Sequence, residues 1–251
     1  MTGGIDLWIR RFHQGPAEAP RLLFFPHAGG SASFFVPLSK RLSAVAQVGC
    51  VQYPGRQDRR GEAPATAIGP LADAVAAVLD PLLDRPVAFF GHSMGAVVAF
   101  EVIRRLEARG AAAPFMLFAS ARNAPSTRHR ERVHQGGDAA LLAKIRSLGG
   151  TDPRVLADPE LVELILPPTR ADYQAIETYS CPPGATVASA VTVLLGDRDT
   201  ATSLPEAARW REHTTGDFAL QVFPGGHFYL VERLAEVADA VAAGLTAASR
   251  I

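Results

Sequence analysis

The fold is determined by residues 86–103, which read PVAFFGHSMGAVVAFEVI. Residues 86–90 are apolar throughout, which is typical of a strand buried on both faces. Residues 95–103 have the length of a helix and small side chains in its first turn. A Gly-x-Ser-x-Gly motif between a strand and a helix predicts a nucleophile elbow, a sharp turn that presents the Ser93 hydroxyl at the amino end of the helix. We expect one motif glycine to supply the backbone conformation and the other to allow close strand–helix approach.

The pattern on either side of this motif predicts an α/β fold. Short apolar runs alternate with helical spacings, which is typical of a mostly parallel central sheet flanked by helices on both faces. Further strands are expected at residues 7–12, 21–25, 48–53, 115–119, 191–195 and 218–223. Helices are expected at residues 68–83, from the elbow to about residue 109, and from about residue 230 onward. We expect residues 1–251 to form a single domain.

Residues 125–183 interrupt this alternation with a segment that is helical throughout. Asp138 is placed to cap a helix over residues 139–148, and Asp158 followed by Pro159 is a typical helix start. We expect Pro167 and Pro168 to end that helix and another to follow at residues 170–179. An all-helical insertion between two strands predicts a lid over the carboxyl ends of the sheet, where sites of such folds lie. The alternative is a helical subdomain that only adds stability.

Composition excludes several classes of partner. The chain of 251 residues carries 25 basic and 25 acidic side chains, a net charge of zero that favours neither nucleic acid nor a membrane surface. No apolar run approaches the length of a membrane span, and the first residues lack the layout of a signal peptide. Cys50 and Cys181 fit no disulfide or metal framework. We therefore expect a cytoplasmic protein, with Cys50 as a small core residue.

A serine hydroxyl needs a neighbouring base, which a carboxylate orients in turn. In folds with this elbow the chain order is serine, then acid, then histidine. His227 fits that order, because it lies in a glycine-rich loop between the last strand and the last helix. His129 and His134 lie among the arginines of the insertion, and His213 is expected to face water or the carbonyl ends of its helix. We therefore predict His227 as the base.

Two carboxylates follow the strand at 191–195, where the acid is expected. Asp197 comes directly after a turn glycine and is placed to accept backbone N–H groups of its own loop. Asp199 lies further along, where the loop turns toward the histidine. We prefer Asp199 as the acid, with Asp197 as the alternative.

An oxyanion hole needs two backbone donors, one of them on the residue after the nucleophile. Met94 holds that position. The second donor is expected from the loop at residues 26–31, which follows a buried strand and contains paired glycines. We predict the Ala28 amide for this role, with Gly29 as the alternative.

Six motifs together resemble the type II thioesterases of polyketide and nonribosomal peptide biosynthesis, members of the α/β-hydrolase superfamily. The similarity spans nearly the whole chain, and the motifs of the insertion are the most specific, because other α/β-hydrolases do not carry them. One departure from the family pattern is Pro168, which bears on packing of the lid and on no catalytic role. The motifs are residues 25–30 (FPHAGG), 53–56 (YPGR), 91–96 (GHSMGA), 148–151 (LGGT), 166–173 (LPPTRADY) and 225–228 (GGHF).

The resemblance implies an α/β-hydrolase fold with a helical lid insertion at residues 125–183. By position it makes Ser93 the nucleophile, Asp199 the acid and His227 the base, with oxyanion donors on Ala28 and Met94. It implies an editing enzyme that removes stalled or aberrant acyl groups from the phosphopantetheine arm of carrier proteins. No metal, nucleotide or other cofactor is implied, and we expect a monomer.

Carrier proteins of this kind are usually acidic, so a basic docking surface is expected. Arg56, Arg59 and Arg60 form one cluster in the sequence. A second cluster lies beside the insertion, and we take it as the candidate docking surface: Arg122, Arg128, Arg130 and Arg132. Two other functions fit the same fold, a carboxylesterase or lipase-like hydrolase and a non-catalytic ligand-binding protein.

Overall fold

The computed structural model describes residues 3–128 and 131–248. Within these residues the strands form one sheet of seven, in the order β1-β3-β2-β4-β5-β6-β7. All neighbouring strands are parallel except β1, which pairs antiparallel with β3. The predicted mostly parallel sheet is therefore confirmed. The strands are β1 (Ile9–Arg10), β2 (Arg21–Phe25), β3 (Gln47–Val51), β4 (Val87–His92), β5 (Met116–Ser120), β6 (Ala190–Gly196) and β7 (Phe218–Phe223).

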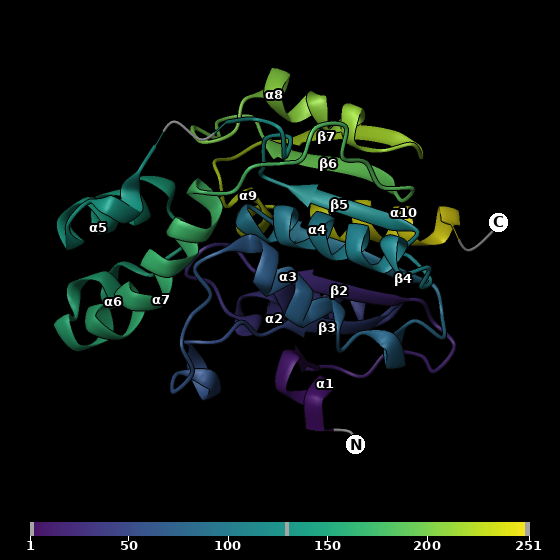
Figure 1. Ribbon diagram of the computed structural model, residues 1–251, viewed down its shortest axis with the longest axis horizontal. Helices are drawn as coiled ribbons and strands as arrows, with labels where there is room; N and C mark the ends of the chain where they lie inside the picture. The colour runs from purple at the N-terminus through teal and green to yellow at the C-terminus, as the bar shows by residue number, and fades with distance from the viewer. Residues whose placement is uncertain (1–2, 129–130, 249–251) are drawn as a thin grey trace.

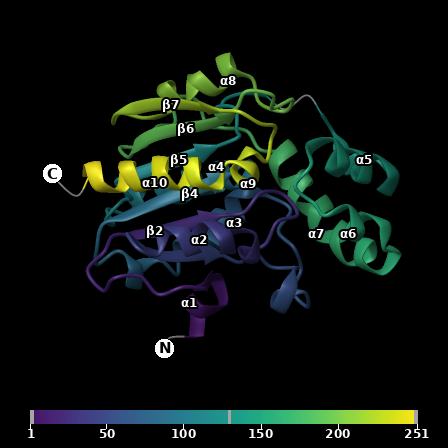
Figure 2. The ribbon, with the colours of Figure 1, turned by 180° about the vertical axis from the view of Figure 1, so that it is seen from behind.

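Helices cover both faces of the sheet. Figure 1 shows α3 (Ile68–Ala76) and α4 (Met94–Ala108) on one face, and Figure 2 shows α2 (Val36–Leu42) and α10 (Leu234–Ala248) on the other. Successive residues of a strand point to opposite faces, so neighbouring phenylalanines of β4 enter different cores. Phe89 packs in the core beneath α3 and α4, whereas Phe90 packs with α2 and α10. Every residue of β4 is buried, as its continuous apolar sequence predicts.

Two elements differ from their sequence-based boundaries. Leu7 and Trp8 belong to α1 (Gly3–Trp8), so the strand expected at 7–12 is only β1, where Ile9 alone enters the core. The helix expected over 68–83 ends at Ala76 and continues as a 3-10 turn, Asp80–Leu82. Pro81 disfavours a continued α-helix here, because it has no N–H to donate to the Ala77 carbonyl and its ring would clash with that carbonyl. Two short helices complete the sheet region, α8 (Leu204–Ala208) and α9 (Tyr229–Glu232).

The predicted helical insertion is present between β5 and β6, and we call it the helical insert. It contains α5 (Asp138–Leu148), α6 (Pro153–Ala157) and α7 (Pro159–Glu177), and the described part of residues 125–183 contains no strand. Figures 1 and 2 show these helices gathered beside one end of the sheet. A small apolar core holds them together, formed by Leu141, Ile145 and Leu166. The insert therefore packs as a unit with its own interior.

The ends of these helices differ in part from expectation. Asp158 caps α7 as predicted, because its carboxylate accepts the amides of Glu160 and Leu161. Asp138 does not cap α5: it lies inside the first turn, and its carboxylate pairs with Arg170 of α7. Pro167 and Pro168 do not end α7, which runs through both. Pro168 is buried, so packing holds the helix together where the prolines remove backbone hydrogen bonds.

Among the described residues, no helix combines the length and the apolar character needed to cross a bilayer.

Candidate active site

The nucleophile elbow is formed as a strained turn between β4 and α4. Ser93 has φ 54° and ψ −119°, and its amide donates to the Ser120 carbonyl at 2.8 Å. Neither motif glycine has positive φ. A Cβ on Gly91 would lie 2.4 Å from Ala96 Cα, and one on Gly95 would lie 2.0 Å from the Phe25 carbonyl oxygen. Both glycines therefore allow close approach, and the unusual conformation lies on the serine itself, which corrects the division expected from the sequence.

His227 is held by Asp199. The imidazole Nδ1 lies 2.9 Å from Asp199 Oδ2, and both side chains are almost completely buried. With Nδ1–H donating to the carboxylate, Nε2 is left as the basic nitrogen. Asp197 has a different partner, because its Oδ1 accepts the Gly225 amide at 2.8 Å. The structure thus brings Asp199 to the imidazole and Asp197 to the loop backbone.

Ser93, His227, Ala28 and Met94 line one cavity of about 380 Å³. These residues follow the ends of different strands, which meet at one edge of the parallel sheet. Among the described residues, neither the Ala28 nor the Met94 amide donates to a protein acceptor. Both are therefore available to an oxyanion. The helical insert closes the opposite wall with Lys144, Leu148, Tyr173, Ile176 and Glu177.

A smaller cavity of about 90 Å³ adjoins the first and shares Ala28, Leu148 and Tyr173 with it. It lies between the loop at residues 27–29 and the helical insert. Its lining is largely apolar and includes Ile145, Ile165, Thr169 and Phe228. The predicted oxyanion loop therefore lines two adjoining cavities, and residues of the insert line both.

Two further histidines lie beside His227. The ring centroids of His92 and His227 are 5.3 Å apart, and those of His27 and His92 are 5.7 Å apart. Burial, and secondarily the charge of His227, lowers the pKa of His27 to about 3 and that of His92 well below its usual value. Both rings are therefore neutral next to the predicted base. His92 Nδ1 pairs with the Ser120 hydroxyl at 2.9 Å, and no sequence pattern singled it out.

The remaining candidate histidines lie away from Ser93. His213 is buried, so the expectation that it faces water is wrong, and the carbonyl it meets belongs to Ala185 and not to its own helix: Nε2 lies 2.8 Å from Ser126 Oγ and Nδ1 lies 2.8 Å from the Ala185 carbonyl. His134 pairs with the carboxylate of Glu177. His129 lies outside the described residues. None of the described ones lines the cavity with Ser93.

The first arginine cluster is not a surface for docking. Arg56 and Arg59 are buried, 6% and 3% exposed, in ion pairs with Asp172 and Glu62. Arg60 alone of the three is exposed.

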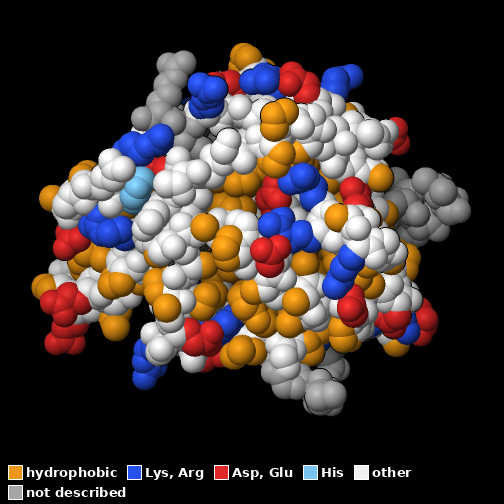
Figure 3. Space-filling view, viewed as in Figure 1, with side chains coloured by type: hydrophobic (Ala, Val, Ile, Leu, Met, Phe, Trp, Pro, Cys, Tyr) orange, Lys and Arg blue, Asp and Glu red, His pale blue; other side chains and the backbone are white. Residues whose placement is uncertain are grey.

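The second cluster is more exposed, because Arg128 and Arg132 are exposed and Arg122 is half-buried. Burial lowers the pKa of Arg122 to about 10, Arg128 lines the cavity, and Arg132 donates to the Glu177 carbonyl. Arg130 lies outside the described residues. On the face that presents α3 and α4, positive and negative side chains are interspersed (Figure 3).

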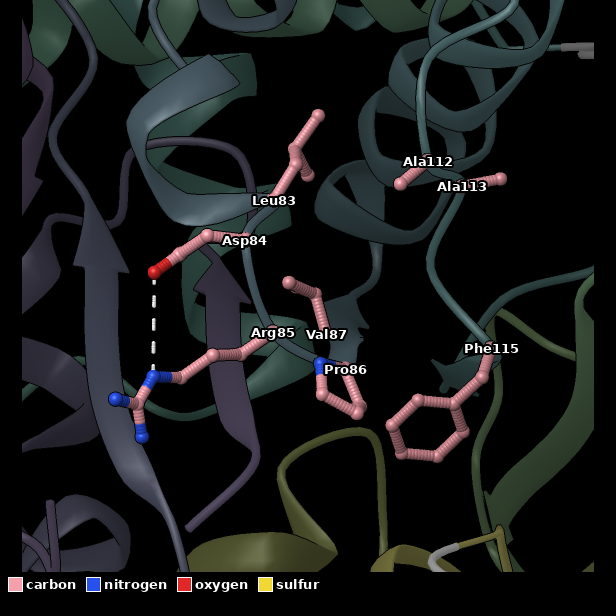
Figure 4. Close-up of a pocket in the computed structure, with 8 residues that line it drawn as sticks. All are labelled: Leu83, Asp84, Arg85, Pro86, Val87, Ala112, Ala113 and Phe115. Atoms are coloured by element: carbon pink, nitrogen blue, oxygen red, sulfur yellow. Dashed lines mark ion pairs between the residues drawn. The ribbon is translucent and has the colours of Figure 1, made fainter. Parts of the chain in front are cut away.

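Another cavity, of about 240 Å³, lies at the opposite end of β4 from Ser93. Figure 4 shows its lining, which includes Pro86, Val87 and Phe115, with the Asp84–Arg85 ion pair at 3.9 Å. The lining holds no serine, cysteine or histidine to act as nucleophile or base. Within residues 3–128 and 131–248, no three histidine, cysteine or carboxylate side chains are grouped to hold a metal ion.

Known proteins are similar to this chain over most of its length. The sequence matches the family described as "Thioesterase domain" over residues 20–245. It is 50% identical to the "Probable cadicidin biosynthesis thioesterase" of Streptomyces griseus over 95% of this chain and 66% of that protein. It is 49% identical to "Thioesterase PikA5" of Streptomyces venezuelae over 93% of this chain and 83% of that protein.

A solved structure of a thioesterase is also similar to this chain. The type II thioesterase BorB from the borrelidin biosynthetic cluster superposes with a TM-score of 0.89, at 45% identity over 96% of this chain and 98% of that one. The α/β-hydrolase fold and the resemblance to type II thioesterases are thereby confirmed. The chain belongs to the thioesterase family and is a hydrolase that acts on thioesters.

Proposed function

We propose that this protein is an editing thioesterase that releases stalled or aberrant acyl groups from the phosphopantetheine arm of carrier proteins in polyketide or nonribosomal peptide biosynthesis. One observation carries the catalytic part of the proposal. His227 Nδ1 is hydrogen-bonded to Asp199 Oδ2 at 2.9 Å, and His227 lines the same cavity as Ser93. The relatives named for biosynthetic clusters support the editing role.

Acylation begins with transfer of the Ser93 hydroxyl proton to His227 Nε2. The Asp199 carboxylate holds Nδ1–H and stabilises the imidazolium that forms. Ser93 Oγ then attacks the thioester carbonyl carbon, and the Met94 and Ala28 amides stabilise the oxyanion. Collapse of the tetrahedral intermediate breaks the C–S bond, and the imidazolium gives its proton to the departing sulfur. The product is an acyl-serine and a free pantetheine thiol.

Hydrolysis of the acyl-serine follows by the reverse proton path. His227 removes a proton from water, the hydroxide attacks the ester carbonyl, and Ser93 leaves with the proton that His227 returns. A thiol with a pKa of about 8.5 leaves far more readily than an alcohol, so thioesters suit this site better than oxygen esters. The free acid then leaves the cavity.

The helical insert is the lid of this enzyme within a single domain of residues 1–251, with the lid at residues 125–183. Lys144, Leu148, Tyr173 and Ile176 close the cavity from the insert side. A carrier-borne arm therefore needs this wall to open, and its closure excludes bulk water during the reaction.

The test is hydrolysis of a panel of acyl-loaded carrier proteins, with Ser93→Ala as the control. We expect turnover by the wild type, and a loss of about 10³-fold or more in Ser93→Ala and His227→Ala. Matched oxygen esters and small thioesters, assayed beside the panel, identify the leaving group and the partner. A preference for the oxygen ester would favour a carboxylesterase. Equal rates on carrier-bound and small thioesters would count against carrier recognition.

A further inference from the structure

A carboxylate of the helical insert holds the loop that carries Ala28. Asp172 of α7 accepts the Gly29 amide on Oδ2 at 2.8 Å. Gly29 directly follows Ala28, so this bond fixes the peptide plane next to the amide predicted to stabilise the oxyanion. The two residues are 143 positions apart in the chain. The contact therefore links the insert to the loop after β2.

Arg56 fixes the carboxylate in turn. Its guanidinium donates to Asp172 Oδ2 at 2.6 Å and to Oδ1 at 2.9 Å, a bidentate pair in which the side chains are 6% and 1% exposed. The same guanidinium donates to the Gly30 carbonyl at 3.0 Å. The loop is thus held at an N–H by Asp172 and at a C=O by Arg56. Planar bidentate geometry fixes direction as well as distance.

The loop packs so closely against α7 that Gly29 has no room for a side chain. Gly29 has φ +77°, and a Cβ there would lie 2.5 Å from Thr169 Oγ1. Thr169 and Asp172 are three residues apart on α7, so they share one face of the helix. That face lies against the loop, and both residues are buried.

We propose that Asp172 and Arg56 are positioning residues that aim the Ala28 amide at the developing oxyanion, so that the oxyanion hole is complete only when α7 of the insert is seated. The inference rests on the proposed function, because it assigns a role within that mechanism. An ion pair that only stabilised the insert would need no bond to the loop, whereas here the same carboxylate oxygen serves Arg56 and the Gly29 amide.

The test compares Asp172→Asn with a matched control on the same insert. Asn keeps the shape of the side chain and one carbonyl oxygen, but its NH2 group cannot accept from Arg56, so the charge and the bidentate pair that fixes its orientation are lost. Removing an oxyanion donor costs about 10²–10³ in kcat, so misaiming one is expected to lower kcat by about 10- to 100-fold with KM nearly unchanged. The affinity for a trifluoromethyl ketone analogue of a small thioester, which forms a tetrahedral adduct on Ser93, should fall by the same factor.

The control is Asp138→Asn, which removes an exposed ion pair with Arg170 inside the insert. It should leave kcat and analogue affinity unchanged. If Asp172→Asn does not fold, Arg56→Lys carries the test, since it keeps the charge but loses the bidentate geometry; we expect a smaller loss of kcat in the same direction.

Unchanged kcat and analogue affinity in the Asp172 and Arg56 variants would overturn the inference, as would a loss confined to KM and the melting temperature. These outcomes require an active wild type. Wild-type protein without thioester hydrolysis, or Ser93→Ala with full turnover, would instead overturn the proposed function.

Discussion

Asp197 and Asp199 are two residues apart on the loop after β6, yet they bond to different partners. Asp199 Oδ2 meets the His227 imidazole, and Asp197 Oδ1 accepts the Gly225 amide. We expect Asp199→Asn to lower kcat by about 10³- to 10⁴-fold, because an amide N–H facing Nδ1 favours the wrong tautomer. Asp197→Asn keeps a carbonyl oxygen for Gly225 and should cost less than about tenfold. Steady-state kinetics on a small thioester measures both. The reverse ordering would assign the acid to Asp197.

The residues that carry the chemistry could be predicted because each follows a local pattern. Ser93 lies in a Gly-x-Ser-x-Gly turn, and His227 lies in a glycine-rich loop at the required place in the chain order. Arg56 and Asp172 could not be paired in this way, because 116 positions separate them and their contact depends on how α7 packs. The sequence therefore indicates that Arg56 belongs to a basic surface cluster, whereas in the structure it is buried.

At the site, β2 and the loop after it approach α4 closely at Gly95. A Cβ on Gly95 would lie 2.0 Å from the Phe25 carbonyl oxygen and 2.7 Å from that of Pro26. Backbone atoms cannot yield as a flexible side chain can, so Gly95→Ala should destabilise the protein by about 3 kcal/mol and distort the elbow. Urea unfolding measures the loss. Gly61→Ala is the matched control, since nothing lies within 4 Å of a Cβ there; equal stability of the two variants would contradict the expectation.

The two prolines inside α7 lower the stability of the helix, and the packing of its other residues compensates for that loss. Pro167 is exposed, so its ring contributes little packing while it removes a backbone hydrogen bond. Pro167→Ala should therefore raise the free energy of unfolding by about 1–3 kcal/mol, seen as a higher melting temperature. Pro159→Ala is the control, because proline fits at the start of the same helix. This variant should not raise the free energy of unfolding. A lower melting temperature for Pro167→Ala would show that the proline is needed for the shape of α7.

Elements with a strong periodic signal were predictable, and those decided by tertiary packing were not. The strand at residues 21–25 and the elbow helix agree with the structure within about a residue. Residues 7–12 alternate in the sequence, but only Ile9 and Arg10 have a partner strand. Pro167 and Pro168 signal a helix end that packing of the insert overrides. Local propensity is a weak guide wherever burial of a face supplies the larger energy.

At the scale of the whole molecule, two apolar cores on either side of the sheet and a third inside the insert meet near the predicted oxyanion loop. Phe25 and Phe89 pack beneath α3 and α4, and Phe24 and Phe90 pack beneath α2 and α10. The insert adds its own core around Leu141. The catalytic candidates lie on loops at the carboxyl ends of the strands, where polar groups must be buried for catalysis. That requirement places ionisable side chains in the interior and makes stability depend on pH.

His27 and His92 determine the direction in which stability changes with pH. Burial first, and the charge of His227 second, lowers the pKa of His27 to about 3, against 6.5 in its ordinary state, and that of His92 well below 6.5. The unfolded chain therefore binds more protons than the folded one as pH falls below 6.5. Their contribution is complete above pH 6.5 and is lost as pH falls below it, at about 1.4 kcal/mol per pH unit for each histidine, down to about pH 3 for His27. Urea unfolding between pH 7 and 5 should show this slope.

The variant His27→Phe isolates one of the two contributions. Phe34 and Phe228 contact the His27 ring, so an apolar ring fits these neighbours, and the variant has no imidazole to protonate. Its free energy of unfolding should fall less steeply below pH 6.5, by about 1.4 kcal/mol per pH unit relative to the wild type. The slope is informative even if the variant is more or less stable at pH 7, because an offset does not change with pH. Parallel curves would mean that His27 takes up a proton in the folded protein as readily as in the unfolded chain.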